Sequence, residues 1–222
     1  MTDFNKNVFI NCPFDDDYRN TLLIPLIFTV KYLGYEPRLS LEKEDSSHTR
    51  IDKIVSIIHE SKYGIHDLSR MISSNKGEHF RMNMPFELGI DFGCKKLMKG
   101  KWENKKILIL EKDRYGYQKA LSDLSGSDIK QHNDDSLKVI KAVRDWFYAE
   151  GSVKDIFGAQ KIFNVFNDWH SYVYNEYVEK CGHASIDDIP IPEAIHCMSD
   201  WISKNVFKDN SVSKKMKEQN II

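Results

Sequence analysis

The sequence predicts an α/β fold, in which helices cover both faces of a parallel sheet and a helical extension follows. From the start to about residue 150, short apolar runs alternate with longer amphipathic segments. The amphipathic segments are long enough to be crossover helices, which parallel strands require. After residue 150 the chain is rich in aromatic residues and shows helical spacing only. These observations divide it into an α/β domain, residues 1–150, and a helical extension, residues 151–222.

Four short apolar runs have the composition of buried strands. They are residues 8–10, 38–41, 63–66 and 106–110. The last, KILIL, is the clearest strand of the chain because all but its lysine are large aliphatic residues. Each run is followed by a polar segment, as expected where a strand leaves the sheet.

Four longer segments are predicted to be helices, at residues 18–33, 51–58, 85–97 and 135–149. In the first, Pro25 predicts either a kink or a helix that begins there, because proline cannot donate a backbone hydrogen bond. A glycine directly after this segment is a typical helix end. Each helix lies between two predicted strands or follows the last of them.

The extension is predicted to contain two or three helices between residues 153 and 207, interrupted by the sequence IPIP at 189–192. Its many aromatic side chains are expected to pack either onto the sheet domain or onto a second subunit. The second alternative makes a homo-oligomer the expected state.

Composition argues against several classes of partner. The 222 residues include 32 basic and 33 acidic ones, so a net charge of -1 offers no electrostatic case for nucleic acid. The four cysteines match no metal-binding spacing, and no metal site is predicted. The longest apolar stretch, residues 22–30, is too short for a bilayer, and the N-terminus lacks a signal-peptide pattern. A cytoplasmic protein with reduced thiols and no membrane contact is expected.

Ligands of open parallel sheets bind beyond the carboxyl ends of the strands. Four polar segments should lie there, at residues 11–18, 42–50, 67–81 and 113–123. The chain has neither a GxGxxG after its first strand nor a P-loop sequence. Phosphate would therefore be bound by helix N-termini and by arginine side chains, the candidates being Arg38, Arg50, Arg70 and Arg81.

The sequence FRMNMPFELG at residues 80–89 is the most informative segment. Pro85 suits the first turn of a helix, and Glu87 is expected in that same turn, facing the loops. Gly89 and Gly93 each disfavour a helix by about 1 kcal/mol, which indicates that a strand or ligand approaches there. Alternatively, Glu87 only complements the helix dipole, an effect of about 0.3–1 kcal/mol.

A strand ending in Asp67, a loop and a helix opening with PFELG together resemble the nucleoside 2-deoxyribosyltransferase superfamily and the related bacterial TIR domains. The resemblance covers roughly residues 7–150 and implies a flavodoxin-like topology. The sequence ELG at 87–89 resembles the transferase motif whose glutamate attacks the sugar C1′, and Asp67 matches an acidic residue of that family. Where the transferases usually have D-x-G-T, this chain has RMNM at 81–84, so the branch stays open.

The resemblance implies cleavage of an N-glycosidic bond, with Glu87 stabilising an oxocarbenium-like transition state. The helix dipole is expected to keep Glu87 ionised. A nucleotide, NAD above all, would be the substrate, and no resident cofactor is expected. Asp67, Ser69 and Asn83 would hold ribose hydroxyls. The complete set of expected substrate contacts is Asn11, Cys12, Pro13, Phe14, Tyr18, Asp67, Ser69, Arg70, Arg81, Asn83 and Phe86.

Some of these assignments have alternatives. Phe14, Tyr18 and Phe86 would stack on a base, although core packing is the more common role of such side chains. His66 is expected to point into the sheet region, and nothing near Cys12 in the sequence would activate it as a nucleophile.

Three functions are consistent with these residues and with the resemblance. The first is a TIR-like NAD glycohydrolase, by analogy acting in bacterial antiphage defence. The second is a nucleoside or nucleotide deoxyribosyltransferase or hydrolase. The third is a non-catalytic nucleotide-sensing or assembly module, in which Glu87 only caps a helix.

Overall fold

A five-stranded parallel sheet forms the centre of the molecule in the computed structural model, which describes residues 3–42, 45, 47–71, 81–114, 116–154 and 156–206. The strands are β1 (Asn7–Asn11), β2 (Glu36–Arg38), β3 (Tyr63–Asp67), β4 (Lys106–Glu111) and β5 (Ile129–Gln131). Their order is β2-β1-β3-β4-β5, and every neighbouring pair is parallel. This order is that of the flavodoxin-like fold, so the predicted fold class is confirmed.

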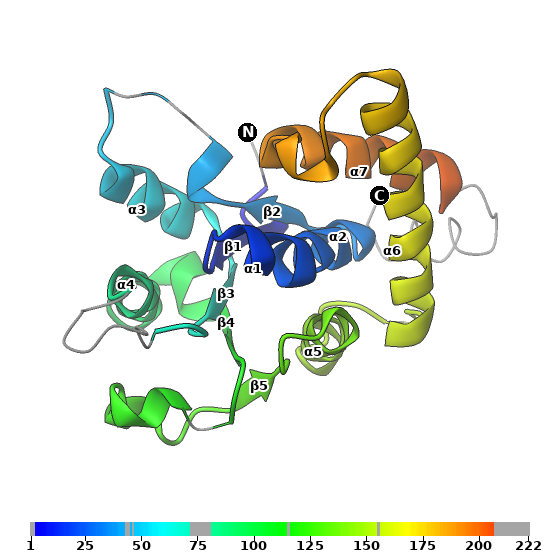
Figure 1. Ribbon diagram of the computed structural model, residues 1–222. Helices are drawn as coiled ribbons and strands as arrows, with labels where there is room; N and C mark the ends of the chain where they lie inside the picture. The colour runs from blue at the N-terminus through cyan, green and yellow to red at the C-terminus, as the bar shows by residue number, and fades with distance from the viewer. Residues whose placement is uncertain are drawn as a thin grey trace.

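Helices cover both faces of the sheet, and two more form an outer layer (Figure 1). The main ones are α2 (Ile24–Tyr32), α3 (Arg50–Glu60), α4 (Asn83–Leu97), α5 (Ser136–Ala149), α6 (Ala159–Val173) and α7 (Ile191–Asn205). Helices α3 and α4 lie on one face, α2 and α5 on the other, and α6 and α7 lie outside α2 and α5. Among the described helices, none is long and apolar enough to cross a membrane.

The predicted first helix is divided into three parts. It begins as the short α1 (Asp16–Tyr18), continues as a π-helical segment, Arg19–Leu23, and becomes α2. Pro25 is the second residue of α2, in the first turn, where the N–H that proline lacks would have no partner within the helix. The wider π turn before it accommodates the proline that a continuous α-helix would exclude. Gly34, with a φ of 79°, follows the end of α2 as predicted.

The two edge strands differ from the prediction. Strand β2 ends at Arg38, and Ser40–Glu42 forms a 3₁₀ turn, so the expected strand at residues 38–41 is wrong for most of its length. The cause is Glu42, whose carboxylate accepts hydrogen bonds from Arg38 Nε at 2.9 Å and Leu39 N at 2.7 Å. These bonds turn the chain away from the sheet. Strand β5 was not predicted because its sequence, IKQ, has a single apolar residue.

The glycine that permits close helix–sheet packing is Gly64 on β3. A Cβ atom there would overlap with Asp91 Oδ2 of α4, at a separation that real Cβ atoms do not reach. At Gly89 and Gly93 nothing lies within 4 Å of such an atom. The expected approach of a strand to α4 at its own glycines is therefore wrong, since the close helix–strand contact occurs at a glycine of the strand.

This difference leads to a paired prediction for two glycine-to-alanine variants. Gly64→Ala should lower the free energy of unfolding by about 1–3 kcal/mol, because the added methyl group overlaps with Asp91. Gly89→Ala should raise it by up to about 1 kcal/mol, because alanine favours the helix and meets no neighbour. Urea unfolding of both variants measures the difference. Equal effects at the two positions would contradict this packing.

The C-terminal helices share one hydrophobic core with the sheet domain. Trp169 of α6 is 1% exposed, and its ring lies 5.6 Å from that of Phe28 in α2. Phe166 lies 5.5 Å from the same ring. These aromatic side chains were expected to pack either onto the sheet domain or onto a second subunit. For Trp169 and Phe166, packing onto the sheet domain is confirmed.

Candidate functional site

The predicted site residues meet at the carboxyl ends of β1 and β3, where the strand order reverses. Cys12, directly after β1, is 2% exposed, and burial raises the pKa of its thiol well above the usual value. The charges of Asp67, Glu87 and Asp15 raise this pKa further, whereas the charge of Arg81 lowers it. A thiol that stays protonated is a poor nucleophile. Cys12 is therefore a packing residue of the main hydrophobic core.

Glu87 is the fifth residue of α4, one position beyond the turn in which it was expected, and no acidic residue lies in the first turn. Its side chain is 3% exposed, and its Oε1 lies 2.9 Å from Nη1 of Arg50, the first residue of α3. Asn83 Nδ2 lies 3.4 Å from the same oxygen. The charge partner of Glu87 is therefore an arginine from a different helix. The alternative of a helix-capping glutamate loses its structural basis.

A buried polar chain holds α4, and with it Glu87, against the sheet. Asn11 Nδ2 donates to the carbonyl of Met84 at 2.9 Å and to His66 Nδ1 at 3.1 Å. His66 Nε2 lies 3.0 Å from Asp91 Oδ2, and Lys105 Nζ lies 3.1 Å from Asp91 Oδ1. Asn11 therefore anchors the start of α4, and His66 lies within the sheet region as expected.

The charges in this chain are matched. Burial raises the pKa of Asp91, but the hydrogen bond from His66 and the charge of Lys105 outweigh it and hold the pKa below its usual value. Asp91 thus remains a carboxylate although its side chain is fully buried. The position of α4 depends on this ion pair, which lies beneath the helix.

Asp67 belongs to a second buried network on the opposite face of the sheet. Its Oδ2 accepts from Tyr18 Oη at 2.5 Å and lies 3.0 Å from His132 Nε2, and its Oδ1 accepts from Ser69 N at 2.8 Å. Burial raises the pKa of Asp67, but the hydrogen bonds from His132, Ser69 and Tyr18 outweigh it and lower the pKa. Asp67 and Ser69 are at most 2% exposed. The structure therefore places both within the protein interior.

Ser69, His132 and Asp67 do not form a nucleophilic triad. Ser69 Oγ and Asp67 Oδ2 both contact Nε2 of His132, at 2.9 and 3.0 Å. Its Nδ1 accepts from the backbone N–H of Asp134 at 3.1 Å. A triad needs its serine and carboxylate on opposite ring nitrogens. His132 was not predicted as a site residue because it follows the unpredicted strand β5.

Two predicted phosphate ligands, Arg70 and Arg81, are bound to acidic side chains after β1. Arg81 Nη2 lies 2.6 Å from Asp15 Oδ2, Arg70 also contacts Asp15, and Arg70 Nη2 lies 2.7 Å from Asp17. Both arginines have a left-handed backbone, with φ of 62° and 53°. Asp15 also accepts from the N–H of Tyr18 and caps α1. Asp15 was not predicted as a site residue, although an aspartate directly before a helix is typical of a cap.

The aromatic candidates divide between core and surface. Tyr18 is fully buried, whereas Phe14 is 37% and Phe86 60% exposed. The core alternative is therefore right for Tyr18 and wrong for the two phenylalanines. Pro13 is buried, and Asn83 is exposed at the start of α4. Phe14 and Phe86 are the two candidates whose rings remain accessible for stacking on a base.

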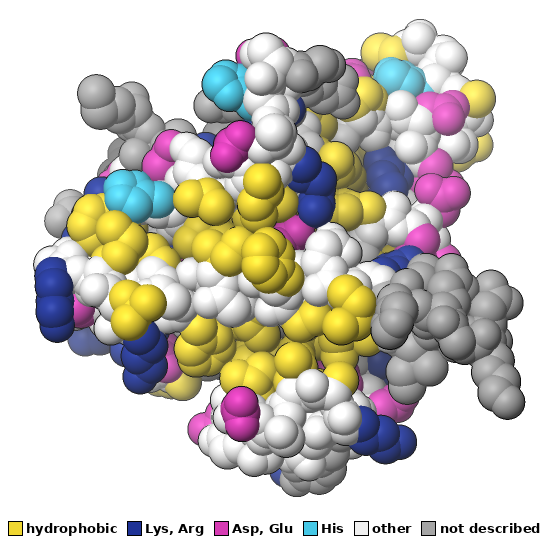
Figure 2. All heavy atoms as spheres, turned by 90° about the vertical axis from the view of Figure 1, so that its left-hand side faces the viewer, with side chains coloured by type: hydrophobic (Ala, Val, Ile, Leu, Met, Phe, Trp, Pro, Cys, Tyr) yellow, Lys and Arg dark blue, Asp and Glu magenta, His cyan; other side chains and the backbone are white. Residues whose placement is uncertain are grey.

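Apolar side chains also gather on the outer surface of α3 and α4 (Figure 2). Ile51 and Val55 of α3 are 39% and 45% exposed. On and beside α4, Met82 and Leu97 are 58% and 82% exposed, and Phe86 belongs to the same group. Apolar patches of this kind often mark contact surfaces.

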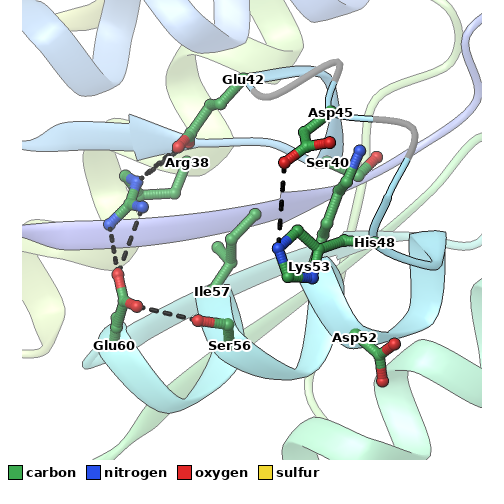
Figure 3. Close-up of a pocket in the computed structure, with 10 residues that line it drawn as sticks. All are labelled: Arg38, Ser40, Glu42, Asp45, His48, Asp52, Lys53, Ser56, Ile57 and Glu60. Atoms are coloured by element: carbon green, nitrogen blue, oxygen red, sulfur yellow. Dashed lines mark hydrogen bonds and ion pairs between the residues drawn. The ribbon is translucent and has the colours of Figure 1, made fainter.

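A separate cavity of about 330 Å³ opens between the end of β2 and α3 (Figure 3). Its described lining contains four carboxylates and two cationic side chains. Arg38 is held between Glu42, at 2.9 Å, and Glu60, at 3.3 Å. The excess of negative charge disfavours an anionic phosphate here, so Arg38 is not placed as a phosphate ligand. Among the described residues, no group of three His, Cys, Asp or Glu side chains could hold a metal ion.

Glu111, at the carboxyl end of β4, is 5% exposed, and burial raises its pKa to about 7. The nearby charge of Asp67 also raises the pKa, whereas the amides of Tyr117 and Gly116 lower it. In the part of the chain that the structure describes, its Oε2 has no hydrogen-bond partner. This buried carboxyl group therefore binds a proton more tightly in the folded state than in the unfolded state.

The raised pKa of Glu111 gives a pH-dependence prediction. Because the folded state keeps the proton longer, this group lowers the free energy of unfolding as the pH rises from about 4.5 to about 7. Glu111→Gln should remove that contribution. The free energy of unfolding of the variant should therefore fall less between pH 5.5 and pH 8 than that of wild type. Urea unfolding of both proteins at these two pH values measures it. The same pH dependence in both proteins would be the contrary result.

No protein-family model matches the chain, and no curated protein matches it.

Proposed function

We propose that this protein is a nucleotide N-glycosidase in which Glu87 is the catalytic carboxylate, and that NAD⁺ is its substrate. The observation that carries the proposal is the environment of Glu87, a nearly buried carboxylate near the ends of β1 and β3, paired with Arg50 at 2.9 Å. Buried charges are retained only where they are paired, and strand ends at a reversal of strand order are the usual ligand sites of this fold. The TIR-like resemblance of the PFELG sequence supports the same residue and the same bond.

The chemistry needs one well-placed carboxylate. The bond between C1′ and the base nitrogen breaks, and both electrons leave with the nitrogen, so the pyridinium of NAD⁺ departs as neutral nicotinamide. Positive charge develops on the ribose, where a carboxylate stabilises it. The oxygen of a water molecule then bonds to C1′, and a proton is released. Exposed Phe86, next to Glu87 in the chain, is the proposed surface on which the base stacks.

Glu87→Gln should lower the rate of base release at least about 100-fold, because the amide cannot supply the negative charge. Its fold should survive, since glutamine keeps the shape of the side chain and the Arg50 guanidinium left without its partner is 50% exposed to water. Purified wild type and variant are incubated with NAD⁺, and released nicotinamide is quantified by chromatography. The midpoint of thermal unfolding is measured for both.

Glu103→Gln is the matched control, because Glu103 is an exposed glutamate paired with Lys99 at 3.5 Å. This control should retain full activity. Equal activity of Glu87→Gln and wild type would refute the role of Glu87. Release of a different base from a nucleoside panel would instead indicate a deoxyribosyltransferase or hydrolase.

A non-catalytic nucleotide-binding or assembly module is the second candidate, and two observations favour it. Asp67 and Asn11 are already fully engaged with protein groups, which leaves few polar side chains for a substrate. The apolar surface of α3 and α4 offers a place for assembly, here most simply with further copies of the chain. This candidate predicts that NAD⁺ or another nucleotide raises the thermal midpoint while no base is released.

A further inference from the structure

We propose that Arg50 makes the site selective for substrates that carry a phosphate group, because the guanidinium that covers Glu87 must leave it before a sugar can approach. The inference rests on the proposed function and names its substrate class: ribosides with a 5′-phosphate or pyrophosphate, rather than free nucleosides.

Among the four arginines that the sequence offers for phosphate binding, Arg50 is the most accessible. The side chains of Arg38, Arg81 and Arg70 are 8%, 20% and 23% exposed, and each binds carboxylates away from Glu87. The Arg50 side chain is 50% exposed. It is also the one whose carboxylate partner is the proposed catalytic group.

The geometry places Arg50 over Glu87. The Glu87 side chain is only 3% exposed, whereas the Arg50 side chain, whose Nη1 contacts its Oε1 at 2.9 Å, is 50% exposed. Arg50 is the first residue of α3, directly after the N-cap Thr49. The capped helix end fixes its backbone, while rotation of its long side chain can move the guanidinium. A carboxylate in this state is shielded from a sugar C1′ until the guanidinium turns outward.

A phosphate group would favour that outward position. Guanidinium groups bind phosphate through two parallel hydrogen bonds, which would replace the ion pair with Glu87. A substrate without phosphate must also break the ion pair between Arg50 and Glu87, but it offers the guanidinium no anionic group to bind instead. One side chain would thus couple recognition of phosphate to exposure of the catalytic carboxylate.

The test compares nicotinamide release from nicotinamide mononucleotide and from nicotinamide riboside, which differ only in the phosphate. Wild type should prefer the mononucleotide by about 10-fold or more in kcat/KM. Arg50→Ala should reduce that ratio to near one, because the mononucleotide loses its phosphate ligand and its KM rises. Arg50→Lys should give an intermediate ratio, because lysine keeps the charge and loses the paired hydrogen bonds.

Arg144→Ala is the control, since Arg144 lies on α5 and binds Asp145 and the carbonyl of Phe157. It should leave the ratio at the wild-type value. An unchanged ratio in Arg50→Ala overturns the inference while leaving Glu87 as the catalytic group. If wild type releases no base, the proposed function fails, and thermal shift with AMP and adenosine decides on Arg50 alone. Stabilisation by AMP over adenosine that disappears in Arg50→Ala supports phosphate recognition, and equal stabilisation by AMP in both proteins refutes it.

Discussion

Replacing Lys105 with methionine should lower the free energy of unfolding by about 3–5 kcal/mol. Lys105 is fully buried, and its Nζ donates to the carbonyl of Ile58 at 2.8 Å and to that of Ser61. The same nitrogen lies 3.1 Å from Asp91 Oδ1. The variant leaves Asp91 as a buried carboxylate whose positive partner is missing, together with two carbonyls that lose a donor. Urea unfolding at pH 7 measures the loss.

Two further variants separate this effect from a general loss of lysine. Lys99→Met removes a lysine whose side chain is 87% exposed and should change stability by less than about 0.5 kcal/mol. The double variant Lys105→Met/Asp91→Leu removes both charges, so its destabilisation should be smaller than the sum of the single effects. Additive losses would show that the two charges do not stabilise one another.

Trp169→Ala should also lower the free energy of unfolding by about 3–5 kcal/mol, because it empties a large volume in the shared core. The indole is 1% exposed and lies 5.6 Å from the ring of Phe28 and 6.0 Å from that of Phe166. Since α6 and α2 meet at this point, the whole chain should still unfold in one transition. Denaturant unfolding followed by tryptophan fluorescence and by circular dichroism measures both properties.

Tyr172→Ala is the matched control on the same helix. Tyr172 is 40% exposed, and its loss should cost less than about 1 kcal/mol. Two separate transitions in wild type, or equal small effects in both variants, would show that the C-terminal helices fold independently of the sheet. That result would also remove the reason for treating the tail aromatics as core residues.

The central strands could be predicted closely. The apolar runs at 8–10, 63–66 and 106–110 lie inside β1, β3 and β4, and each observed strand extends the run by no more than two residues. These strands are covered by helices on both faces, so burial leaves a continuous apolar signal in the sequence. The edge strands β2 and β5 carry a weak signal because three residues each, partly exposed, need few apolar side chains.

The site could be predicted only in part. The sequence indicated which residues would reach the strand ends, and Cys12, Asp67 and Glu87 do lie close enough there to interact electrostatically. It did not indicate their partners. Arg50 reaches Glu87 from another helix, and His132 reaches Asp67 from the loop after β5. Pairing over such separations depends on how the elements pack, and no local pattern records it.

By itself the sequence determined the fold class, because the alternation of apolar strands with helices long enough to cross over permits only a parallel sheet covered on both faces. It also determined that Glu87 would belong to the helix between the third and fourth central strands. The tertiary structure alone decided that Glu87 and Asp91 would be buried, and that Gly64 rather than Gly89 would receive the close contact. The physical reason is range: periodicity arises from neighbours within a few residues, whereas burial and charge pairing arise from side chains brought together by the whole fold.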